Sequence, residues 1–504
     1  MARFALGIDI GTSGVKGVLI EPGGAQVAEA YAPHDLHSPY PGWSEEDPAD
    51  WWRGVISVCQ QLLTGRDPRD IAVIGCSGMV PALVLLDEDG NPLRPAILQN
   101  DARAVEEIEW LRQNLNQEQL FARTGGYTNQ QHVGPRLMWI QRHEPDVWHH
   151  THRILGSYDY IAYRLSGAWS LEINWAVESG LFDIYKRIWD ETFLKTSNLH
   201  EGLFPPVKFP TEIVGEVTRE AAEATGLAPG TPVVAGSADH VASALAAGLR
   251  EHGDLLIKFG AAGDILYCMD RLETHPRLYI DYHDIPERYL LNGCMAASGS
   301  LVKWFVTQVL GEEGGSATYR RLDEEAAAVP PASDGLIVLP YFLGEKTPIF
   351  DPEARGIFFG LTLSHGRGHM FRAILEAVIY GFQHHLEILR ERGYPIRRVL
   401  ATDGGVRSEL WRQIAADALG LPIEAHPGHP GSALGVAFVA GMGVGLFRDW
   451  AEIEAFAGPA YWNEPDPEAH ERYQEAYRLY RDLYETLKPL FPRAGRLSRS
   501  AAAS

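Results

Sequence analysis

The chain of 504 residues is too long for one hydrophobic core, so its length predicts two or more domains. Hydrophobic residues make up 45% of it and charged residues 22%, as in an ordinary globular protein. The net charge of −22 opposes nucleic-acid binding, because phosphate contacts need clustered Lys and Arg. It is compatible with a nucleotide that a glycine-rich loop and a metal ion hold.

The N-terminal sequence MARFALGIDIG lacks the basic segment, long apolar stretch and cleavage site of a signal peptide. No apolar run approaches the ~18 residues of a membrane helix. The four cysteines, at positions 59, 76, 268 and 294, have no CxxC spacing, which argues against a zinc site or a disulfide framework. We therefore expect a cytoplasmic protein without a membrane partner.

The chain begins with three predicted strands. Two apolar strands, 4–10 and 15–21, flank a turn of small residues, and a third strand follows at 23–34. Asp47 and Pro48 are typical of a helix start, so a helix is expected over 45–63. The next expected elements are a buried strand at 70–78, a hairpin over 82–104, a helix at 104–115 and an insertion from 119 to 205.

The second half repeats the opening pattern. Residues 253–270 have the order apolar strand, Gly-x-x-Gly turn and apolar strand, like residues 4–21. This repeat indicates either a duplicated unit that grips a mononucleotide or two unrelated hairpins. Further on we expect a long helix from about 366, a strand–turn–helix over 396–424, a small-residue helix at 431–447 and a charged helix from 467.

Residues 9–16, DIGTSGVK, place small residues between two strands. Their backbone N–H groups can form an anion cradle, with the hydroxyls of Thr12 and Ser13 as further donors. Asp9, at the strand end, can orient a hydrated Mg²⁺ ion. The spacing is not that of a P-loop, and a plain β-hairpin with a glycine turn is the alternative.

Two other stretches place polar or small residues after a strand. Gly404 and Gly405 precede a helix, where they either let a flat ring or a phosphate approach the backbone or form an ordinary turn. Asn100 and Asp101 follow an apolar strand and can hold the hydroxyls of a polyol. Alternatively, Asp101 caps the following helix.

Asp239 is the one carboxylate in GSADHVASALAAG, residues 236–248. Phosphoryl transfer to an alcohol needs a carboxylate that accepts the hydroxyl proton, and the small residues before Asp239 leave room for a substrate. Asp239 also fits the N-cap of a helix that follows it. The two roles are compatible, because a helix N-terminus favours anionic groups.

Several ordered segments resemble the FGGY carbohydrate kinases, and among these the xylulokinase-like branch. The resemblance runs along nearly the whole chain, through GIDIGTSGVKGVLIE (7–21), GWSEEDPADWW (42–52), GNPLRPAILQNDARA (90–104), GPRLMWIQRHEPDVW (134–148), ARGIFFGLTLSH (354–365) and GGVRSELWRQIAADALGLPI (404–423). It implies an α/β, actin-like ATPase architecture of two RNase H-like domains facing across a cleft. The N-terminal domain, 1–249, would bind sugar, and the C-terminal domain, 250–504, would bind ATP and end in a helical tail.

The resemblance also implies roles for individual residues. Asp239 matches the family's catalytic base, and Asp9 matches a residue near Mg²⁺. The implied sugar contacts are Asn100, Asp101, Met79 and His240. The implied ATP and phosphate contacts are Gly11, Thr12, Ser13, Lys16, Gly260, Ala261, Gly263, Gly404, Gly405 and Arg407.

The sequence departs from the family pattern on both sides of the reaction. The usual Ser-Gly-Gln-Met-His-Gly is SGMVPA at 77–82, so Val80 and Pro81 replace polar sugar contacts. Gln99 stands where Trp is usual, and His240 where Asn is usual. Ala261 replaces a phosphate-loop threonine, a loss of about 1–2 kcal/mol in the transition state, or roughly tenfold in rate.

The sequence therefore predicts an ATP- and Mg²⁺-dependent kinase that phosphorylates a primary hydroxyl of a small open-chain sugar or polyol. A ketopentose such as xylulose or ribulose ranks first, then a tetritol or pentitol, then glycerol. The alternative is a degenerate kinase that acts as an ATP- or sugar-sensing binding protein. A homodimer is compatible with the resemblance, since dimers are common in the family.

Overall fold

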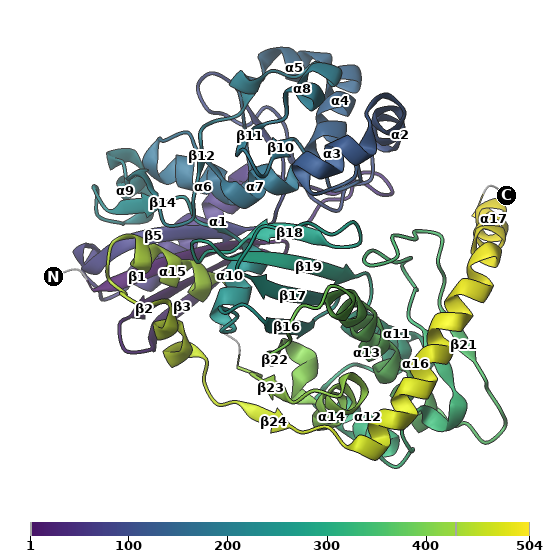
Figure 1. Ribbon diagram of the computed structural model, residues 1–504. Coiled ribbons are helices and arrows are strands. Elements are labelled where there is room, and N and C mark those ends of the chain that lie inside the picture. Colours follow the sequence, from purple (N-terminus) through teal and green to yellow (C-terminus); the bar gives the residue numbers. More distant parts are fainter. Residues whose placement is uncertain (1–2, 429–430, 503–504) are drawn as a thin grey trace. The chain divides into compact units, whose positions relative to one another are not determined.

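The structure, a computed structural model, describes residues 3–428 and 431–502. Their packing forms two compact units, each built around a mixed β-sheet with helices (Figure 1). Unit 1 comprises Met1–Arg250, Asp270–Leu290 and Pro430–Ala457, and unit 2 comprises Glu251–Met269, Leu291–His429 and Gly458–Ser504. The predicted α/β class with two domains is confirmed, whereas the domain ranges 1–249 and 250–504 stay predictions.

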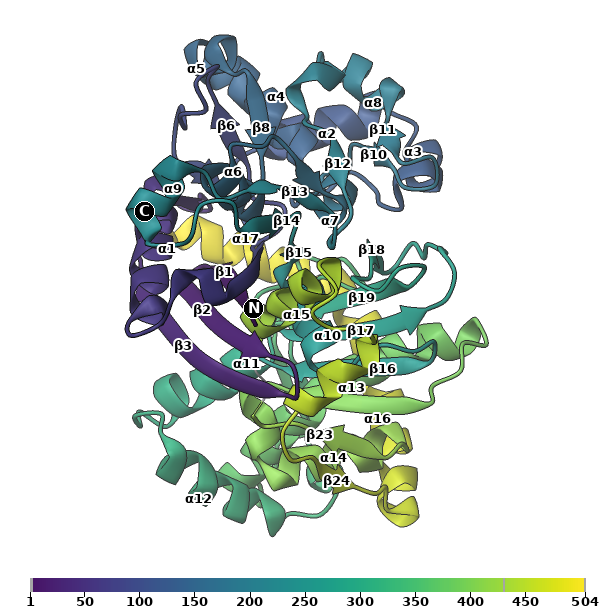
Figure 2. The same ribbon diagram turned by 90° about the vertical axis from the view of Figure 1, so that its left-hand side faces the viewer.

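The described part of unit 1 holds a seven-stranded sheet in the order β13-β14-β5-β1-β2-β3, with β15 paired to β5. Strands β1, β2 and β3 are antiparallel neighbours (Figure 2), and β5 runs parallel to β1. The strands are β1 Phe4–Gly11, β2 Gly14–Glu21, β3 Ala25–Pro33, β5 Ile71–Gly78, β13 Ile213–Glu216, β14 Pro232–Val234 and β15 Ser237–Ala238. The three strands predicted at 4–34 and the strand predicted at 70–78 are therefore confirmed.

Helices cover both faces of this sheet, and glycines in the strands allow these helices to approach the sheet closely. A Cβ atom on Gly7 would lie 1.9 Å from the carbonyl oxygen of Ala433 in helix α15. A Cβ atom on Gly17 would lie 2.2 Å from a methyl of Val58 in helix α1. Because Gly17 pairs with Ile8, the residue after Gly7, the two glycines face opposite sides. Helix α15 therefore covers one face and α1 the other.

The helices of unit 1 were predicted in part. The helix expected over 45–63 is α1, and Asp47 caps it by accepting a hydrogen bond from the Ala49 N–H at 2.9 Å. The small-residue helix expected at 431–447 is α15. The helices of unit 1 are α1 Pro48–Leu63, α2 Val105–Asn114, α3 Gln117–Thr124, α4 Val133–His143, α5 Pro145–His150, α6 Ser157–Ser166, α7 Ile173–Glu178, α8 Glu191–Thr196, α9 Arg219–Thr225, α10 Asp239–Ala246 and α15 Ser432–Gly443.

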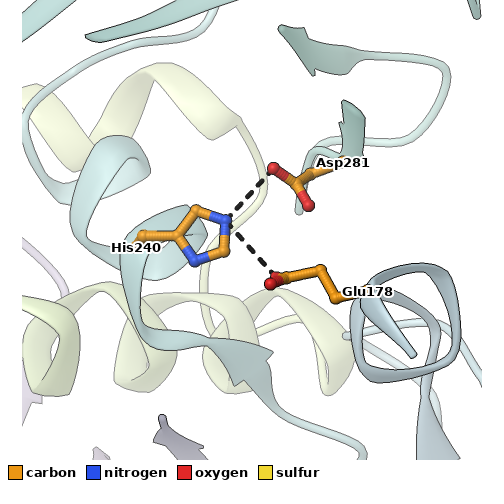
Figure 3. A group of neighbouring side chains, drawn as sticks. All are labelled: Glu178, His240 and Asp281. Atoms are coloured by element: carbon orange, nitrogen blue, oxygen red, sulfur yellow. Dashed lines mark hydrogen bonds and ion pairs between the residues drawn. The ribbon is translucent and has the colours of Figure 1, made fainter. Parts of the chain in front are cut away.

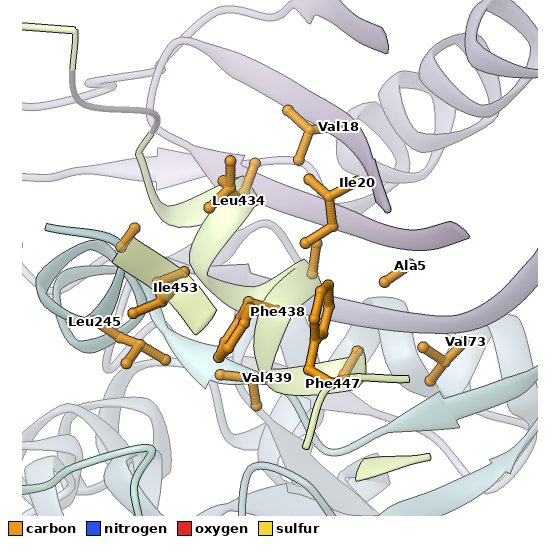
Figure 4. Packing of buried hydrophobic residues seen from close by; sticks show 14 of the residues in the cluster. Ala5, Val18, Ile20, Val73, Leu245, Leu434, Phe438, Val439, Phe447 and Ile453 are labelled. Carbon is orange, nitrogen blue, oxygen red and sulfur yellow. The ribbon is translucent and has the colours of Figure 1, made fainter. Parts of the chain in front are cut away.

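Helix α15 also brings the apolar core of unit 1 together. Its side chains Leu434, Phe438 and Val439 pack against Ala5 and Val18 of the sheet, together with residues of α10 (Figure 4). Helices α10 and α15 also approach each other closely. A Cβ atom on Gly435 would lie 2.0 Å from the backbone oxygen of Ala242, so only glycine fits at this position. This packing holds the first residues of α10 against the same face of the sheet.

Replacing Gly7 tests this packing. In Gly7→Ala the new methyl must displace α15 from β1, so we expect a loss of about 2–3 kcal/mol in the free energy of unfolding. Urea denaturation measures the loss. Gly315→Ala is the control, because nothing lies within 4 Å of that Cβ position, and it should cost less than 1 kcal/mol. Equal costs for the two variants would contradict the close approach of α15 to β1.

Unit 2 repeats the strand arrangement of unit 1. The second seven-stranded sheet follows the order β18-β19-β17-β16-β22-β23-β24. Strands β16 and β17 are antiparallel, as β1 and β2 are in unit 1. Strand β22 runs parallel to β16, as β5 does to β1, and β23 runs parallel to β22, as β14 does to β5. The strands are β16 Asp254–Phe259, β17 Gly263–Met269, β19 Tyr289–Met295, β22 Arg398–Thr402, β23 Ile423–Ala425 and β24 Tyr461–Asn463. The sequence repeat at 4–21 and 253–270 therefore corresponds to the same strand arrangement in both units.

The helices expected in the second half are also present. The long helix predicted from about 366 is α13, and the strand–turn–helix over 396–424 is β22 followed by α14. The helices of unit 2 are α11 Gly299–Trp304, α12 Ser316–Ala327, α13 Arg367–Glu391, α14 Glu409–Leu419, α16 Pro467–Leu487 and α17 Phe491–Ala502. Among the described residues, none of the helices has the combination of length and apolar character that crossing a bilayer requires.

Short strands complete both units, and two of them belong to the hairpin predicted over 82–104. The expected hairpin over 82–104 keeps its turn, since Asp87 N–H donates to the Asn91 oxygen at 3.0 Å. Its two arms also pair with each other, since Leu83 lies opposite Ile97 and the Leu83 N–H donates to the Ile97 oxygen at 2.8 Å, so the predicted hairpin is confirmed. The same arms have further partners, because β6 also pairs with β8 and β7 with β4. The short strands are β4 Glu45–Glu46, β6 Val84–Leu86, β7 Ala96–Ile97, β8 Arg153–Leu155, β9 Leu171–Glu172, β10 Phe182–Asp183, β11 Ile188–Trp189, β12 Val207–Lys208, β18 Tyr279–Tyr282, β20 Ile337–Leu339 and β21 Ile357–Phe359.

Candidate active site

Asp9 lies near the end of β1, at one level with residues of the neighbouring strands. It pairs with Lys16 of β2 and with Ser77 of β5, and Ser77 in turn pairs with Ser237 of β15. The Ser77 hydroxyl donates to Asp9 Oδ1 at 2.8 Å. Because side chains alternate along a strand, Asp9 faces the same side as Gly7, the side that α15 and α10 cover. Ser77 was not among the predicted site residues.

A second carboxylate lies close to Asp9. Burial, together with the negative charge of Asp239, raises the pKa of Asp9 to about 6. Hydrogen bonds from Ser77 and Ser432 and the positive charge of Lys16 act in the opposite direction. The structure therefore brings the predicted base and the predicted Mg²⁺ residue together, although 230 positions of chain separate them. The Asp9 carboxylate and the Ser77 hydroxyl beside it are hard oxygen donors, which suit a Mg²⁺ ion.

Asp239 occupies the first turn of α10 but does not cap it. The N-cap position belongs to Ala238, and Asp239 is the first helical residue, so the N-cap prediction for Asp239 is wrong by one position. Its Oδ1 accepts a hydrogen bond from the His240 N–H at 2.6 Å, and its side chain is 39% exposed. The short strand β15 ends immediately before Asp239, so the carboxylate lies at the carboxyl end of that strand. A ligand can therefore reach this carboxylate.

His240 belongs to a cluster that sequence reasoning did not find. Its imidazole lies among Asp239, Glu178 at the end of α7 and Asp281 on β18 (Figure 3). Asp281 is buried, with its side chain 1% exposed. No local pattern marks Glu178 or Asp281, since each is a single acid on a separate element that packing brings to α10.

The predicted sugar-binding pair Asn100 and Asp101 has two different environments. Asp101 is buried, and it accepts hydrogen bonds from the Ser44 N–H at 2.7 Å and from Arg103 Nε at 2.8 Å. It does not cap the next helix, because Ala104 is the N-cap of α2. Asn100 is exposed, and its carbonyl oxygen accepts from Gln130 Nε2 at 3.0 Å. Asp101 therefore holds a loop in place, and Asn100 is the more accessible member of the pair.

The segment SGMVPA is fixed by side-chain donors from three helices. The Ser157 hydroxyl donates to the Met79 oxygen at 2.8 Å, Arg136 Nη2 to the Pro81 oxygen at 3.1 Å, and Trp175 Nε1 to the Ala82 oxygen at 2.7 Å. Met79 and Val80 are both buried. The segment that carries polar sugar contacts in the resembling family is therefore a rigid, largely apolar one here.

The first predicted phosphate loop is the turn between β1 and β2. Thr12 and Ser13 are exposed, and Tyr31 donates its hydroxyl hydrogen to the Ser13 oxygen at 2.6 Å. Gly11 and Gly14 form the last residue pair of the two strands. Lys16 Nζ lies 3.6 Å from Glu29 Oε2 on β3. The turn thus presents two hydroxyl side chains to solvent, as an anion cradle requires.

The second predicted loop, in unit 2, joins β16 to β17. Gly263 pairs with Phe259, and the loop is braced by the Gly299 N–H, which donates to the Gly260 oxygen at 2.8 Å. Ala261 is exposed. A Cβ atom on Gly260 would lie 2.9 Å from Asp403 Oδ2, so this loop adjoins the turn after β22.

The turn after β22 contains Gly404, Gly405 and Arg407. Space around Gly404 is open, which allows a ligand to approach the backbone. Gly405 has a packing role instead, because its Cβ would lie 2.6 Å from the ring of Trp411. Arg407 is exposed. Asp403, absent from the predicted site, has φ of 74°, an unusual value for a residue with a side chain and one that recurs at functional sites.

Comparisons with known proteins point to the same family in both halves of the chain. The family description "FGGY family of carbohydrate kinases, N-terminal domain" matches residues 4–246, and its C-terminal counterpart matches residues 274–444. The xylulose kinase of Escherichia coli (strain K12) is 30% identical over 488 residues, which are 96% of this chain and 99% of that protein. The L-xylulose/3-keto-L-gulonate kinase of the same organism is 30% identical over 497 residues, 97% and 98% of the two chains. The crystal structure of xylulose kinase from Rhodospirillum rubrum has 43% identity and a TM-score of 0.91, and covers 97% of this chain and 100% of that one.

Proposed function

Because the chain belongs to the FGGY family of carbohydrate kinases, we propose that its substrate is a ketopentose, xylulose or ribulose. The chain is a carbohydrate kinase that phosphorylates its sugar with ATP. The similarity to xylulose kinases extends over nearly the full length of both chains, at 43% identity for the protein from Rhodospirillum rubrum. This similarity carries the choice of a ketopentose.

Asp239 is the proposed general base. Its carboxylate accepts the proton of a primary sugar hydroxyl, and that oxygen forms a bond to the γ-phosphorus of ATP. The bond between the γ-phosphorus and the β–γ bridging oxygen breaks, and ADP leaves with the electron pair. The observation that supports this role is the position of Asp239: an accessible carboxylate at the start of α10, beside Asp9 and His240.

Mg²⁺ is the proposed metal partner of ATP. Asp9, with the hydroxyl of Ser77 at its side, would hold the hydrated ion, and the ion would neutralise charge on the phosphates. Thr12, Ser13 and Lys16 in unit 1, and Gly260 to Gly263 with Gly404 and Arg407 in unit 2, are the proposed phosphate and nucleotide contacts. Asn100 and Met79 are carried over as proposed sugar-side residues. A cytoplasmic location and a homodimer are further proposals from the sequence.

A different acceptor is the main alternative. The buried Val80 and Pro81 replace polar contacts, which favours smaller or less oxygenated acceptors such as a tetritol, a pentitol or glycerol. The relatives reported above are kinases, and none of them supports the degenerate, sensing protein.

A substrate panel tests the proposed function. The purified chain, with ATP and Mg²⁺, is assayed for ADP release with xylulose, ribulose, a tetritol, a pentitol and glycerol. We expect the highest kcat/KM with a ketopentose, by at least about tenfold, because sites built around substrate hydroxyls discriminate strongly. A higher value with a tetritol or pentitol would replace the ketopentose, and ATP binding without any turnover would revive the sensing protein.

A further inference from the structure

The imidazole of His240 is surrounded by carboxyl groups on both ring nitrogens. Nε2 lies 3.2 Å from Asp281 Oδ2 and 3.7 Å from Glu178 Oε1 (Figure 3). Nδ1 lies 3.5 Å from Asp239 Oδ1. The ring therefore links Asp239, the proposed base, to two acids on α7 and β18. All four side chains belong to unit 1.

The charges in this cluster follow from burial and neighbours. Burial disfavours the charged imidazole, but Asp281 and Asp239 outweigh it and hold the pKa of His240 well above its ordinary value. Burial raises the pKa of Glu178 to about 8, against the opposing effect of His240. The neighbouring acids therefore favour the charged imidazole of His240, whereas burial favours the protonated form of Glu178.

Other charged groups surround the same place. Asp284 is buried in the segment after β18; burial raises its pKa to about 7, and Ser237 and His240 lower it. Asp9 faces Asp239 from β1, and Lys16 faces Asp9 from β2. Several acids thus surround the imidazole of His240 at this end of the sheet.

We propose that His240 is a positioning residue, which Asp281 and Glu178 hold at Nε2 so that Nδ1 keeps the carboxylate of Asp239 in the orientation that accepts the substrate proton. The proposal rests on the proposed function, in which Asp239 is the base. The His240 N–H holds Asp239 Oδ1 at 2.6 Å, and the imidazole adds a second contact to the same oxygen, which further restricts the rotamers of a side chain that is 39% exposed. Fixing a reacting group accelerates the chemical step without changing the affinity for substrate.

This geometry argues against the direct sugar contact that the family resemblance implies for His240. A direct sugar contact needs a ring nitrogen that points to a hydroxyl group. Here Nε2 faces Asp281 and Glu178, and Nδ1 faces Asp239. The residue after the base therefore acts on the base, and Asp281 acts through His240.

Asp281→Asn and His240→Asn test the proposal by steady-state kinetics on the sugar that the panel identifies. We expect each variant to lower kcat by about 10- to 100-fold, while KM for the sugar changes less than about threefold. The double variant should be about as slow as the slower single variant, because both changes break one linkage. Asp190→Asn is the matched control: this buried acid of unit 1 pairs with Arg123, and its loss should leave kcat unchanged.

Several results would overturn the proposal. These are a normal kcat in Asp281→Asn, an increase in KM alone, or effects that multiply in the double variant. A fourth is calorimetric binding of Zn²⁺ that Asp281→Asn abolishes, since ligand atoms of Glu178, His240 and Asp281 lie within 4.8 Å of one another. The proposed function fails separately, if the wild-type chain turns over no sugar or Asp239→Asn remains active.

Discussion

Asp239→Asn should lower sugar-dependent ADP formation by about a thousandfold and leave ATP binding intact. The amide has the same shape as the carboxylate, but it cannot accept the hydroxyl proton, and general-base catalysis typically contributes about 10²- to 10⁴-fold. The substituted side chain stays at the first position of α10, where Asn is tolerated, so the helix should persist. Initial rates of ADP release, with calorimetry for ATP, measure the two parts of this expectation.

Asp190→Asn again serves as the control, since it removes a buried carboxylate from the same unit but from another network. A turnover in Asp239→Asn within threefold of the wild-type rate would remove Asp239 as the base. Loss of both turnover and ATP binding would instead indicate a general disturbance of the structure, which thermal unfolding of the variant would reveal.

Arg136→Met should reduce the free energy of unfolding by about 3–5 kcal/mol, the largest stability change that we expect. The guanidinium is fully buried and donates to the backbone oxygens of Leu98 at 2.8 Å and of Pro81 at 3.1 Å. It also donates to the oxygens of His132, Ile97 and Gln131. These carbonyls would lose charged donors, each worth about 1.5–3 kcal/mol, and methionine offers no replacement.

Urea denaturation, followed by tryptophan fluorescence, measures this loss. Arg69→Met is the control, because that guanidinium is 83% exposed and pairs with Asp67 at the surface, so its removal should cost less than about 1 kcal/mol. Equal midpoints and slopes for Arg136→Met and the wild-type chain would show that these carbonyls do not depend on Arg136. Since Arg136 holds Pro81, the variant should also lose sugar turnover.

Much of the fold could be predicted because its signals are local. The apolar run of β1, the glycine turn after it and the alternating residues of β2 lie within 18 consecutive positions, and the same pattern appears at β16 and β17. Asp47 and Pro48 mark the start of α1 for the same reason. The hairpin predicted over 82–104 forms for the same reason, with Leu83 opposite Ile97, whereas its additional pairing with β4 and β8, which are distant in sequence, had no local signal.

The sequence predicted those residues of the candidate site that lie within a local sequence motif. Asp9 lies in an apolar strand before a turn of small residues, Asp239 directly follows a run of small residues, and the structure brings them together. The helix-cap readings of Asp239 and Asp101 were each misplaced, because helix starts shift by a residue or more when tertiary contacts occupy the side chain. Asp101 is turned inward by Arg103, which no local pattern indicates.

The sequence by itself determined the fold class, the duplicated strand–turn–strand units, the kinase family and the identity of the candidate base, because these depend on short-range patterns of apolar, glycine and acidic residues. Only the tertiary structure decided what surrounds that base. Glu178 and Asp281 lie on elements far from His240 in the chain, and sheet topology and helix packing place them against one imidazole. Charge interactions across such distances in sequence leave no local signature, since they arise only when the elements have packed.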